Sequence, residues 1–426
     1  MKKILYIVLD GVGDLPHPDL GGRTPLEAAN ISNMNSLATR GKMGLVYTVK
    51  KGVAPESDVA VMSLLGYDAD KYYPGRGPLE AAGIGLRVND GDLVLRGNFA
   101  AGASGNAIVD RRVGRSLWTE ESEVLAKSVS ESLKLESSPS TFKFVSTIGY
   151  RNVLLIRRRS GALSGNISNT DPAYERVSTY SIAKDEFEMK VCESKPLDES
   201  QEARAAATLV NEFTQKSREI LESHPVNQRR VYEGKLPANL VLLRDAGSRR
   251  PSLPSLNRLF GIRFGSLVEL PVEEGIARLS GMEVFTVPLN ESTLDQHYKR
   301  MEQLVPSILE HNDGVYVHIK GPDEPAHDGL AEEKKKILED IDKYFFTPLL
   351  NDIGLDETVI AITGDHSTPC ILKSHSADPV PLLLLGPGIK SDDLSGFNER
   401  ICRRGSIGTI NGPEIMPMLT KSAKAP

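Results

Sequence analysis

Four short stretches of the chain are largely apolar and lack the alternation that marks a strand with one exposed face. Strands buried on both faces have this composition, and they belong to parallel sheets covered by helices. The four stretches are residues 4–9, 315–319, 359–363 and 381–385. Between these stretches, residues 26–40 and residues 331–346 carry apolar side chains at helical spacing. This order of elements predicts an α/β fold with a mostly parallel sheet and helices on both faces.

The middle of the chain follows a different pattern. Short, partly alternating stretches such as residues 142–148 precede a long helical stretch at residues 199–222. This mixture predicts a smaller α+β domain over residues 85–235. We expect it to be inserted in a discontinuous main domain made of residues 1–84 and 236–426.

The composition is that of an ordinary globular protein, with 40% hydrophobic and 25% charged residues. A formal net charge of −6 argues against a nucleic-acid partner. Cys192, Cys370 and Cys402 lie far apart, which predicts no disulfide framework and favours a reducing compartment. The first apolar stretch ends at Asp10, too soon for a signal peptide, and no stretch is long enough to span a membrane. We therefore expect a cytoplasmic protein; the sequence does not indicate its oligomeric state.

Acidic and histidine side chains lie beside the predicted strands. They are Asp10 after the first, Asp323 and His327 after the second, Asp365 and His366 after the third, and His375 before the fourth. Because open α/β sheets bind ligands at the carboxyl ends of their strands, these groups are expected at one edge of the sheet. Carboxylates and imidazoles without cysteine are suited to a pair of divalent ions, Mn²⁺, Mg²⁺, Co²⁺ or Zn²⁺. Taken singly, each residue has an alternative role in a turn, cap or loop.

Ser57 precedes a predicted helix over residues 58–65 and has two interpretations. It is suited to be the N-cap of that helix, with Pro55 upstream. The same position also suits phosphate, because the first amides of a helix are unpaired and carry positive charge. A serine bound to a metal ion there would be a nucleophile.

Basic side chains for an anionic substrate lie in three places. Arg111, Arg112 and Arg115 share a short glycine-containing loop, Arg76 lies in a predicted Gly-Arg-Gly-Pro turn, and Arg244 follows a predicted strand over residues 240–243. Arginine binds phosphate and carboxylate through two parallel hydrogen bonds. The alternative is a set of solvated surface charges. That alternative is also the simplest interpretation of the Lys334–Lys336 run, where Glu332 and Lys336 have the spacing of an ion pair on a helix.

Long strings of this sequence resemble the archaeal-type, cofactor-independent phosphoglycerate mutases of the alkaline phosphatase superfamily. The resemblance covers nearly the whole chain. It rests on VLDGVGD, ESDVAVMSLLGYD, YYPGRGPLEAAGIGL, NFA followed by DRRVGR, HIKGPDEPAHDG, TGDHSTP and SHSADPVP. The resemblance implies an alkaline-phosphatase-like main domain, and an insertion that closes over 3-phosphoglycerate or 2-phosphoglycerate and excludes water. It also implies that 2,3-bisphosphoglycerate is not needed.

The resemblance also assigns roles to individual residues. Ser57 corresponds to the nucleophile that becomes phosphoserine. One metal ion would be bound by Asp10, Ser57, Asp365 and His366, and the other by Asp323, His327 and His375. The substrate would be bound by Asp110, Arg111, Arg112 and Arg115 of the insertion. We expect Asp110 to transfer the proton between the two substrate oxygens.

Two residues depart from the family pattern. Glu56 stands beside the serine where a small residue is expected, and Asp245 stands where the family tends to have glycine. These differences leave two alternatives open. One is another metal-dependent phosphatase or phosphomutase of the same superfamily, and the other is a paralogue without catalytic activity.

Overall fold

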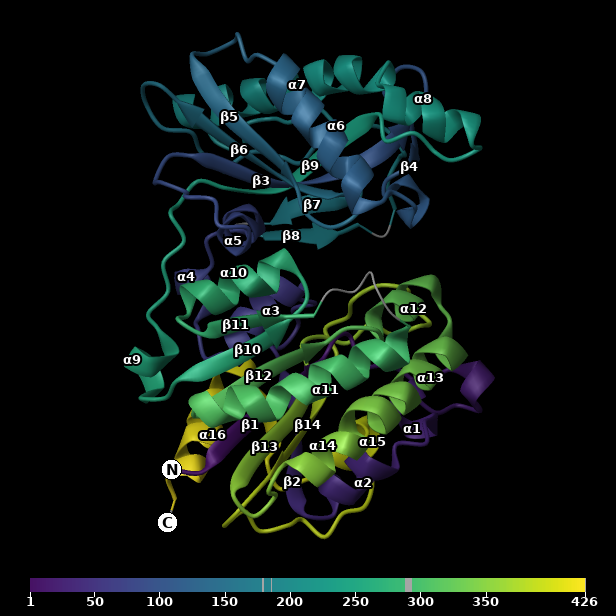
Figure 1. The fold of residues 1–426 in the computed structure, drawn as a ribbon, viewed down its shortest axis with the longest axis vertical. Helices are drawn as coiled ribbons and strands as arrows, with labels where there is room; N and C mark the ends of the chain where they lie inside the picture. The colour runs from purple at the N-terminus through teal and green to yellow at the C-terminus, as the bar shows by residue number, and fades with distance from the viewer. Residues whose placement is uncertain (178–179, 185, 288–292, 426) are drawn as a thin grey trace. The chain divides into compact units, whose positions relative to one another are not determined.

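The chain forms two structural units, each with its own sheet (Figure 1). The computed structural model describes residues 1–177, 180–184, 186–287 and 293–425. The first unit comprises Met1–Tyr72, Leu253–Glu269 and Ile276–Pro426. The second unit comprises Tyr73–Ser252 and Leu270–Gly275, so most of it lies between two parts of the first unit in sequence.

The first unit contains an eight-stranded sheet in the order β11-β10-β12-β1-β13-β14-β2-β15. The strands are β1 (Lys3–Leu9), β2 (Gly41–Tyr47), β10 (Phe264–Val268), β11 (Glu283–Thr286), β12 (Gly314–Ile319), β13 (Thr358–Gly364), β14 (Val380–Leu385) and β15 (Gly408–Asn411). All neighbours pair in parallel except β14, which is antiparallel to both β13 and β2. The predicted mostly parallel sheet is therefore confirmed.

Helices cover both faces of this sheet (Figure 1). One face packs against α1, α2, α11, α13 and α14, and α16 contacts β1 and β13. On β1, Tyr6 points to the face opposite Leu5 and Ile7 and donates a hydrogen bond to the carbonyl of Leu64 in α3. The helices are α1 (Pro25–Ala28), α2 (Ser32–Ala38), α3 (Ser57–Leu64), α4 (Ala69–Tyr72), α9 (Leu256–Phe260), α10 (Pro271–Leu279, shared between the units), α11 (Leu294–His311), α12 (Asp323–Asp328), α13 (Ala331–Ile341), α14 (Thr347–Asp352), α15 (Glu399–Cys402) and α16 (Ile415–Lys424). Within the described residues, none of these helices has the length and apolar character of a membrane span.

The single helix predicted over residues 26–40 is wrong. The chain forms α1 and α2 instead, because Ala29 is extended (ψ 144°) and interrupts the helical path. The predicted helix over residues 331–346 is confirmed as α13, which continues into a wider helical turn over Asp342–Phe346.

The predicted exposed lysine run on α13 is only partly correct. Lys334 is fully buried, whereas Lys335 and Lys336 reach solvent. Lys336 pairs with Asp340, and Glu332 pairs with Lys335, so the predicted pair of Glu332 with Lys336 is not the one that forms.

The second unit is an α+β structure around an antiparallel sheet. Its strands are β3 (Leu93–Gly102), β4 (Ile108–Asp110), β5 (Ser140–Ser146), β6 (Arg151–Arg158) and β9 (Leu240–Gly247), with a separate hairpin of β7 (Tyr174–Val177) and β8 (Tyr180–Ala183). The core packs this sheet against α6 (Thr119–Ser132) and α7 (Gln201–Glu222). The other helices of the unit are α5 (Arg76–Gly83) and α8 (Pro225–Tyr232). The α+β character predicted for this part of the chain is thus confirmed.

Candidate functional site

Three adjacent strands at the centre of the first sheet end at the same edge. β1 lies between β12 and β13, and their carboxyl ends lead into Asp10, α12 and the Asp365-His366 pair respectively. The backbone amide of Gly11 donates a hydrogen bond to Oδ1 of Asp365 over 3.0 Å, which ties the first loop to the third. The topology therefore brings these segments together as expected for a ligand site in an open α/β sheet.

Asp10, Ser57, Asp365 and His366 converge on one point. Nε2 of His366 lies 3.1 Å from Oγ of Ser57, 3.3 Å from Oδ2 of Asp365 and 3.4 Å from Oδ1 of Asp10. These two carboxylate oxygens are buried and have no hydrogen-bond partner among the described residues. Buried anionic oxygens without donors are costly unless a cation neutralises them, so the donor set fits a divalent ion.

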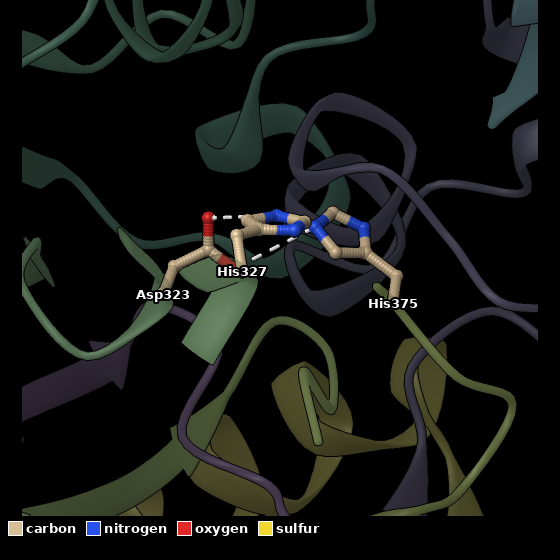
Figure 2. A group of neighbouring side chains, drawn as sticks. All are labelled: Asp323, His327 and His375. Carbon is tan, nitrogen blue, oxygen red and sulfur yellow. Dashed lines mark ion pairs between the residues drawn. The ribbon is translucent and has the colours of Figure 1, made fainter. Parts of the chain in front are cut away.

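Asp323, His327 and His375 form a second group beside the first (Figure 2). Oδ2 of Asp323 lies 3.4 Å from Nε2 of His327, and Oδ1 of the same carboxylate lies 3.6 Å from Nε2 of His375. Figure 2 shows both imidazole rings beside that carboxylate. Because Asp323 also belongs to a set with Asp10 and His366, its carboxylate lies between the two groups.

Each of the three imidazoles has its other nitrogen directed at an oxygen. Nδ1 of His327 lies 3.1 Å from the carbonyl of Lys373, and Nδ1 of His375 lies 2.8 Å from the carbonyl of Pro55. Nδ1 of His366 lies 2.9 Å from Oγ1 of Thr368. A carbonyl can only accept a hydrogen bond, so Nδ1 carries the proton in His327 and His375, and Nε2 is left to bind a metal ion.

The charges of the two groups stabilise one another. Burial disfavours the ionised form of Asp323, but the neighbouring histidines outweigh it and hold the pKa of that carboxyl well below its usual range. Burial likewise opposes the charged form of His366, and the carboxylates of Asp365, Asp10 and Asp323 outweigh it and raise the pKa of the imidazole. The site therefore concentrates negative charge that attracts cations.

Ser57 is the first residue of α3 and not its N-cap. The cap position belongs to Glu56, whose side chain makes no capping hydrogen bond. The Glu56 carboxylate lies 3.9 Å from Nδ1 of His375 instead. The N-cap interpretation of Ser57 is therefore wrong, and its hydroxyl is directed toward His366.

Two residues of this site were missed by the sequence reasoning. Nζ of Lys320 lies 3.0 Å from Oδ2 of Asp10, and Nε2 of His318 lies 3.5 Å from Oδ2 of Asp365. His318 is fully buried within β12 and forms a third candidate metal-binding set with Asp10 and Asp365. Both residues lie in the string HIKGPDEPAHDG, but His318 was read only as part of an apolar stretch, and the Asp323 and His327 pair drew the attention away from Lys320.

The second unit contains a separate cluster of arginines. Arg76, Arg96 and Arg244 are each at most 7% exposed, and Arg76 and Arg96 both pair with Glu80. Burial, followed by repulsion from Arg76 and Arg244, lowers the pKa of Arg96 to about 10. The guanidinium carbon of Arg244 stacks 3.6 Å from the ring centre of Tyr174. A buried excess of guanidinium groups favours binding of an anion.

Two predictions about these arginines need correction. Arg76 is not in the predicted turn, because it begins α5, and its side chain is buried. Arg244 does not follow its strand, because β9 continues to Gly247. Asp245, the next residue, has a φ of 57°, a conformation that glycine adopts more easily. The positive φ explains why glycine is suited to position 245. The aspartate found there places a carboxylate oxygen 3.3 Å from the guanidinium of Arg244.

The loop that carries the other arginines is shaped by Asp110. Oδ1 of Asp110 accepts hydrogen bonds from the amides of Arg112 and Gly114. Val113 and Arg115 both have positive φ, of 55° and 54°, which is unusual for residues with a Cβ. Strained backbone of this kind persists where the surrounding structure enforces it and is frequent at functional sites.

The arginines of this loop differ in their surroundings. Arg111 forms two hydrogen bonds of 2.7 Å with the buried Asp171, so part of its donor capacity is already used. Arg112 is half-buried, and Arg115 is exposed. The structure brings Asp110 and these three arginines together in one loop of the second unit.

Comparison with known proteins identifies relatives along the whole chain. A family model described as 2,3-bisphosphoglycerate-independent phosphoglycerate mutase matches residues 38–227. The proteins of that name from Aeropyrum pernix and Thermococcus kodakarensis are 48% and 39% identical to this chain. The matches cover 97% and 98% of this chain, and 98% and 96% of the relatives.

Two solved structures share the fold. A Pyrococcus horikoshii protein is 30% identical with a TM-score of 0.77, covering 100% of this chain and 98% of its own. The cofactor-independent phosphoglycerate mutase of Thermoplasma acidophilum is 33% identical with a TM-score of 0.61, covering 99% of this chain and 100% of its own. The resemblance noted in the sequence is thereby confirmed.

Proposed function

Because this chain belongs to the family of 2,3-bisphosphoglycerate-independent phosphoglycerate mutases, we propose that it interconverts 3-phosphoglycerate and 2-phosphoglycerate through a phosphoserine on Ser57. The enzyme is an isomerase, since one phosphate moves between two oxygens of the same glycerate. The observation that carries the role of Ser57 is its 3.1 Å approach to His366 beside two buried, unpartnered carboxylate oxygens. We expect it to act in the cytoplasm on this small molecule, without a nucleic-acid or membrane partner.

Two divalent ions are part of this proposal. Asp10, Ser57, Asp365 and His366 would bind one ion, and Asp323, His327 and His375 would bind the other. The mixture of oxygen and imidazole ligands accepts Mn²⁺, Mg²⁺, Co²⁺ or Zn²⁺. When bound, such ions neutralise charge on a transferring phosphate and favour ionisation of the serine hydroxyl.

The reaction conserves every atom of the substrate. Ser57 acts as an alkoxide, its proton having passed to solvent, and it is released as the same alkoxide at the end. Its Oγ attacks phosphorus, and the bond between phosphorus and the 3-oxygen of glycerate breaks. The 3-oxygen takes up a proton, the 2-hydroxyl loses one, and the 2-oxygen then attacks the phosphoserine and releases Ser57. Asp110 is our candidate for carrying this proton between the two oxygens; its Oδ1 is engaged by two backbone amides, so Oδ2 would carry the proton.

The arginines of the second unit are proposed to bind the anionic groups of the substrate. Support comes from the buried excess of positive charge around Arg76, Arg96 and Arg244. The loop arginines Arg111, Arg112 and Arg115 would add donors for the carboxylate or phosphate. A mutase, unlike a phosphatase, has to retain glycerate after its phosphate has been transferred, and binding of the remaining anionic group would serve that purpose.

The decisive experiment supplies Mn²⁺-loaded protein with 3-phosphoglycerate and no 2,3-bisphosphoglycerate. Phosphorus NMR is expected to show 2-phosphoglycerate accumulating to equilibrium, with no inorganic phosphate. Release of inorganic phosphate without 2-phosphoglycerate would instead identify a phosphatase. No change in the substrate with any of the four metals would favour a paralogue without catalytic activity.

A further inference from the structure

Thr368 links both candidate metal groups through one hydroxyl. Its Oγ1 donates a hydrogen bond of 2.7 Å to Oδ1 of Asp323, and the same oxygen lies 2.9 Å from Nδ1 of His366. A threonine hydroxyl has only one proton, and that proton is directed at the carboxylate. Oγ1 must therefore accept from His366, which requires Nδ1 of that ring to carry a proton.

From this geometry we propose that Thr368 is a positioning residue that fixes His366 with Nε2 as its metal-binding nitrogen and simultaneously orients the carboxylate of Asp323. Whereas His327 and His375 are oriented by backbone carbonyls, His366 depends on a side chain that substitution can remove. Metal ligands are commonly oriented by such partners, whose loss weakens metal binding. The inference rests on the metal centre of the proposed function and adds a role that the ligands themselves do not have.

The backbone around Thr368 is fixed on several sides. Its amide donates to the carbonyl of Gly13 over 2.9 Å, and its carbonyl accepts from Nζ of Lys334 over 3.0 Å. Nζ of Lys334 also donates to the carbonyl of Gly13 and, over 2.8 Å, to Oδ2 of Asp14. One buried ammonium thus joins the loop after β1, the loop after β13 and helix α13, which restricts the movement of Thr368.

The loop after β1 also leaves room for the hydroxyl. Gly11 has a φ of 62°, and a Cβ on it would lie 2.8 Å from Oδ1 of Asp323 and 2.9 Å from Oγ1 of Thr368. Any larger residue there would press on the hydrogen bond between these two atoms. Thr368 itself is fully buried, so water does not compete for its hydroxyl.

The test compares three variants in metal-stripped protein titrated with Mn²⁺, with free Mn²⁺ measured by electron paramagnetic resonance. Thr368→Val keeps the shape and removes the hydroxyl, and Thr368→Ser keeps the hydroxyl. Thr363→Val is the matched control, because Thr363 is equally buried on β13 and its hydroxyl donates to the carbonyl of Pro381, away from the ligands.

We expect Thr368→Val to weaken Mn²⁺ binding about 10–100-fold, and Thr368→Ser and Thr363→Val to stay within about 3-fold of wild type. Wild-type affinity in Thr368→Val, or equal weakening in Thr368→Ser, overturns the inference. If the wild-type protein binds no Mn²⁺, the metal centre of the proposed function fails as well, which the titration distinguishes from failure of Thr368 alone.

A second measurement needs no altered Thr368. In Zn²⁺-loaded wild-type protein labelled with ¹⁵N-histidine, the His366 signals are identified by their loss in His366→Gln. We expect the proton of that ring on Nδ1 and the metal on Nε2. A proton on Nε2 would contradict the proposed orientation, even if the valine variant failed to fold.

Discussion

The hydroxyl oxygen of Ser57 lies 3.1 Å from Nε2 of His366, although 309 positions separate the two residues in the sequence. Ser57 begins α3, and the first amides of a helix have no partner within that helix. A phosphate on Ser57 would thus meet helix amides on one side and the ligands of a metal ion on the other. This arrangement suits a serine that accepts a phosphate and later gives it up.

Substitution of Ser57 by alanine tests that role. We expect Ser57→Ala to reduce mutase kcat roughly 10⁴-fold or more, because the variant has no hydroxyl at this position to accept the phosphate. Incubation with ³²P-labelled 3-phosphoglycerate should label the wild type and leave the variant unlabelled. Ser36→Ala, at an exposed position in α2, is the matched control and should keep full activity. Turnover by Ser57→Ala near the wild-type rate would exclude Ser57 as the nucleophile.

Mn²⁺ binding should weaken as the pH falls. Burial lowers the pKa of His327 and of His366, but the neighbouring carboxylates outweigh this and raise both values above 6.5. A metal ion binds only the unprotonated nitrogen, so protons compete with it below those raised values. Mn²⁺ titrations between about pH 5.5 and pH 8.5, a range that includes the ordinary pKa of histidine, should show an affinity for Mn²⁺ that rises steadily with pH. An affinity independent of pH would contradict the assignment of imidazole ligands.

Arg96 offers a test of the proposed anion site. Its guanidinium is buried and repelled by Arg76 and Arg244. Glu80 also pairs with Arg76 over 2.9 Å, so removal of Arg96 does not leave the Glu80 carboxylate without a cation. We expect Arg96→Met to raise KM for 3-phosphoglycerate about 10-fold or more while leaving Mn²⁺ affinity unchanged. Arg157→Met, which removes a half-exposed arginine of β6, is the control and should leave KM unchanged. An unchanged KM in Arg96→Met would exclude this cluster from substrate binding.

The sequence predicted the centre of the fold well, because the three strands that position the site are buried on both faces. Residues 4–9, 315–319 and 359–363 correspond closely to β1, β12 and β13. An apolar stretch does not encode strand direction, however, so the antiparallel course of β14 could not be read from its composition. The residues that follow these strands came together because topology, and not spacing along the chain, brings them to one edge.

The parts of the site that escaped prediction depend on long-range packing. Lys334 looked like one of three solvated lysines, and only the fold places its ammonium between Asp14 and two carbonyls. Thr368 carries no pattern of its own, since its role follows from the simultaneous approach of Asp323 and His366. Helix capping likewise misled the interpretation of Ser57, because Glu56 occupies the cap position without using its side chain there.

Lys334 and Asp14 allow a stability prediction with an internal control. Both side chains are 0% exposed and their charges are 2.8 Å apart. Lys334→Met should lower the free energy of unfolding by about 3–5 kcal/mol, since it leaves the Asp14 carboxylate buried without its cation. Lys336→Met, on the same helix and 69% exposed, should change it by less than about 0.5 kcal/mol. Urea denaturation of both variants measures the difference; similar values would contradict the structural role of Lys334.

Glu302 in α11 predicts a dependence of stability on pH that is separate from the metal site. Burial, and then the neighbouring carboxylate of Asp352, raise the pKa of Glu302 from 4.5 to about 7. The folded protein therefore keeps this proton up to about pH 7, whereas the unfolded chain loses it near pH 4.5, so stability decreases as the pH rises through this window. Glu302→Gln is neutral throughout and should be more stable than wild type at pH 8, by on the order of 1–3 kcal/mol, with little difference near pH 4.5. Glu310→Gln, at an exposed position of the same helix, should show no such dependence. Urea unfolding of the metal-free proteins at both pH values measures this difference in the free energy of unfolding. If wild type is as stable as Glu302→Gln at pH 8, ionisation of Glu302 does not lower the stability of the fold.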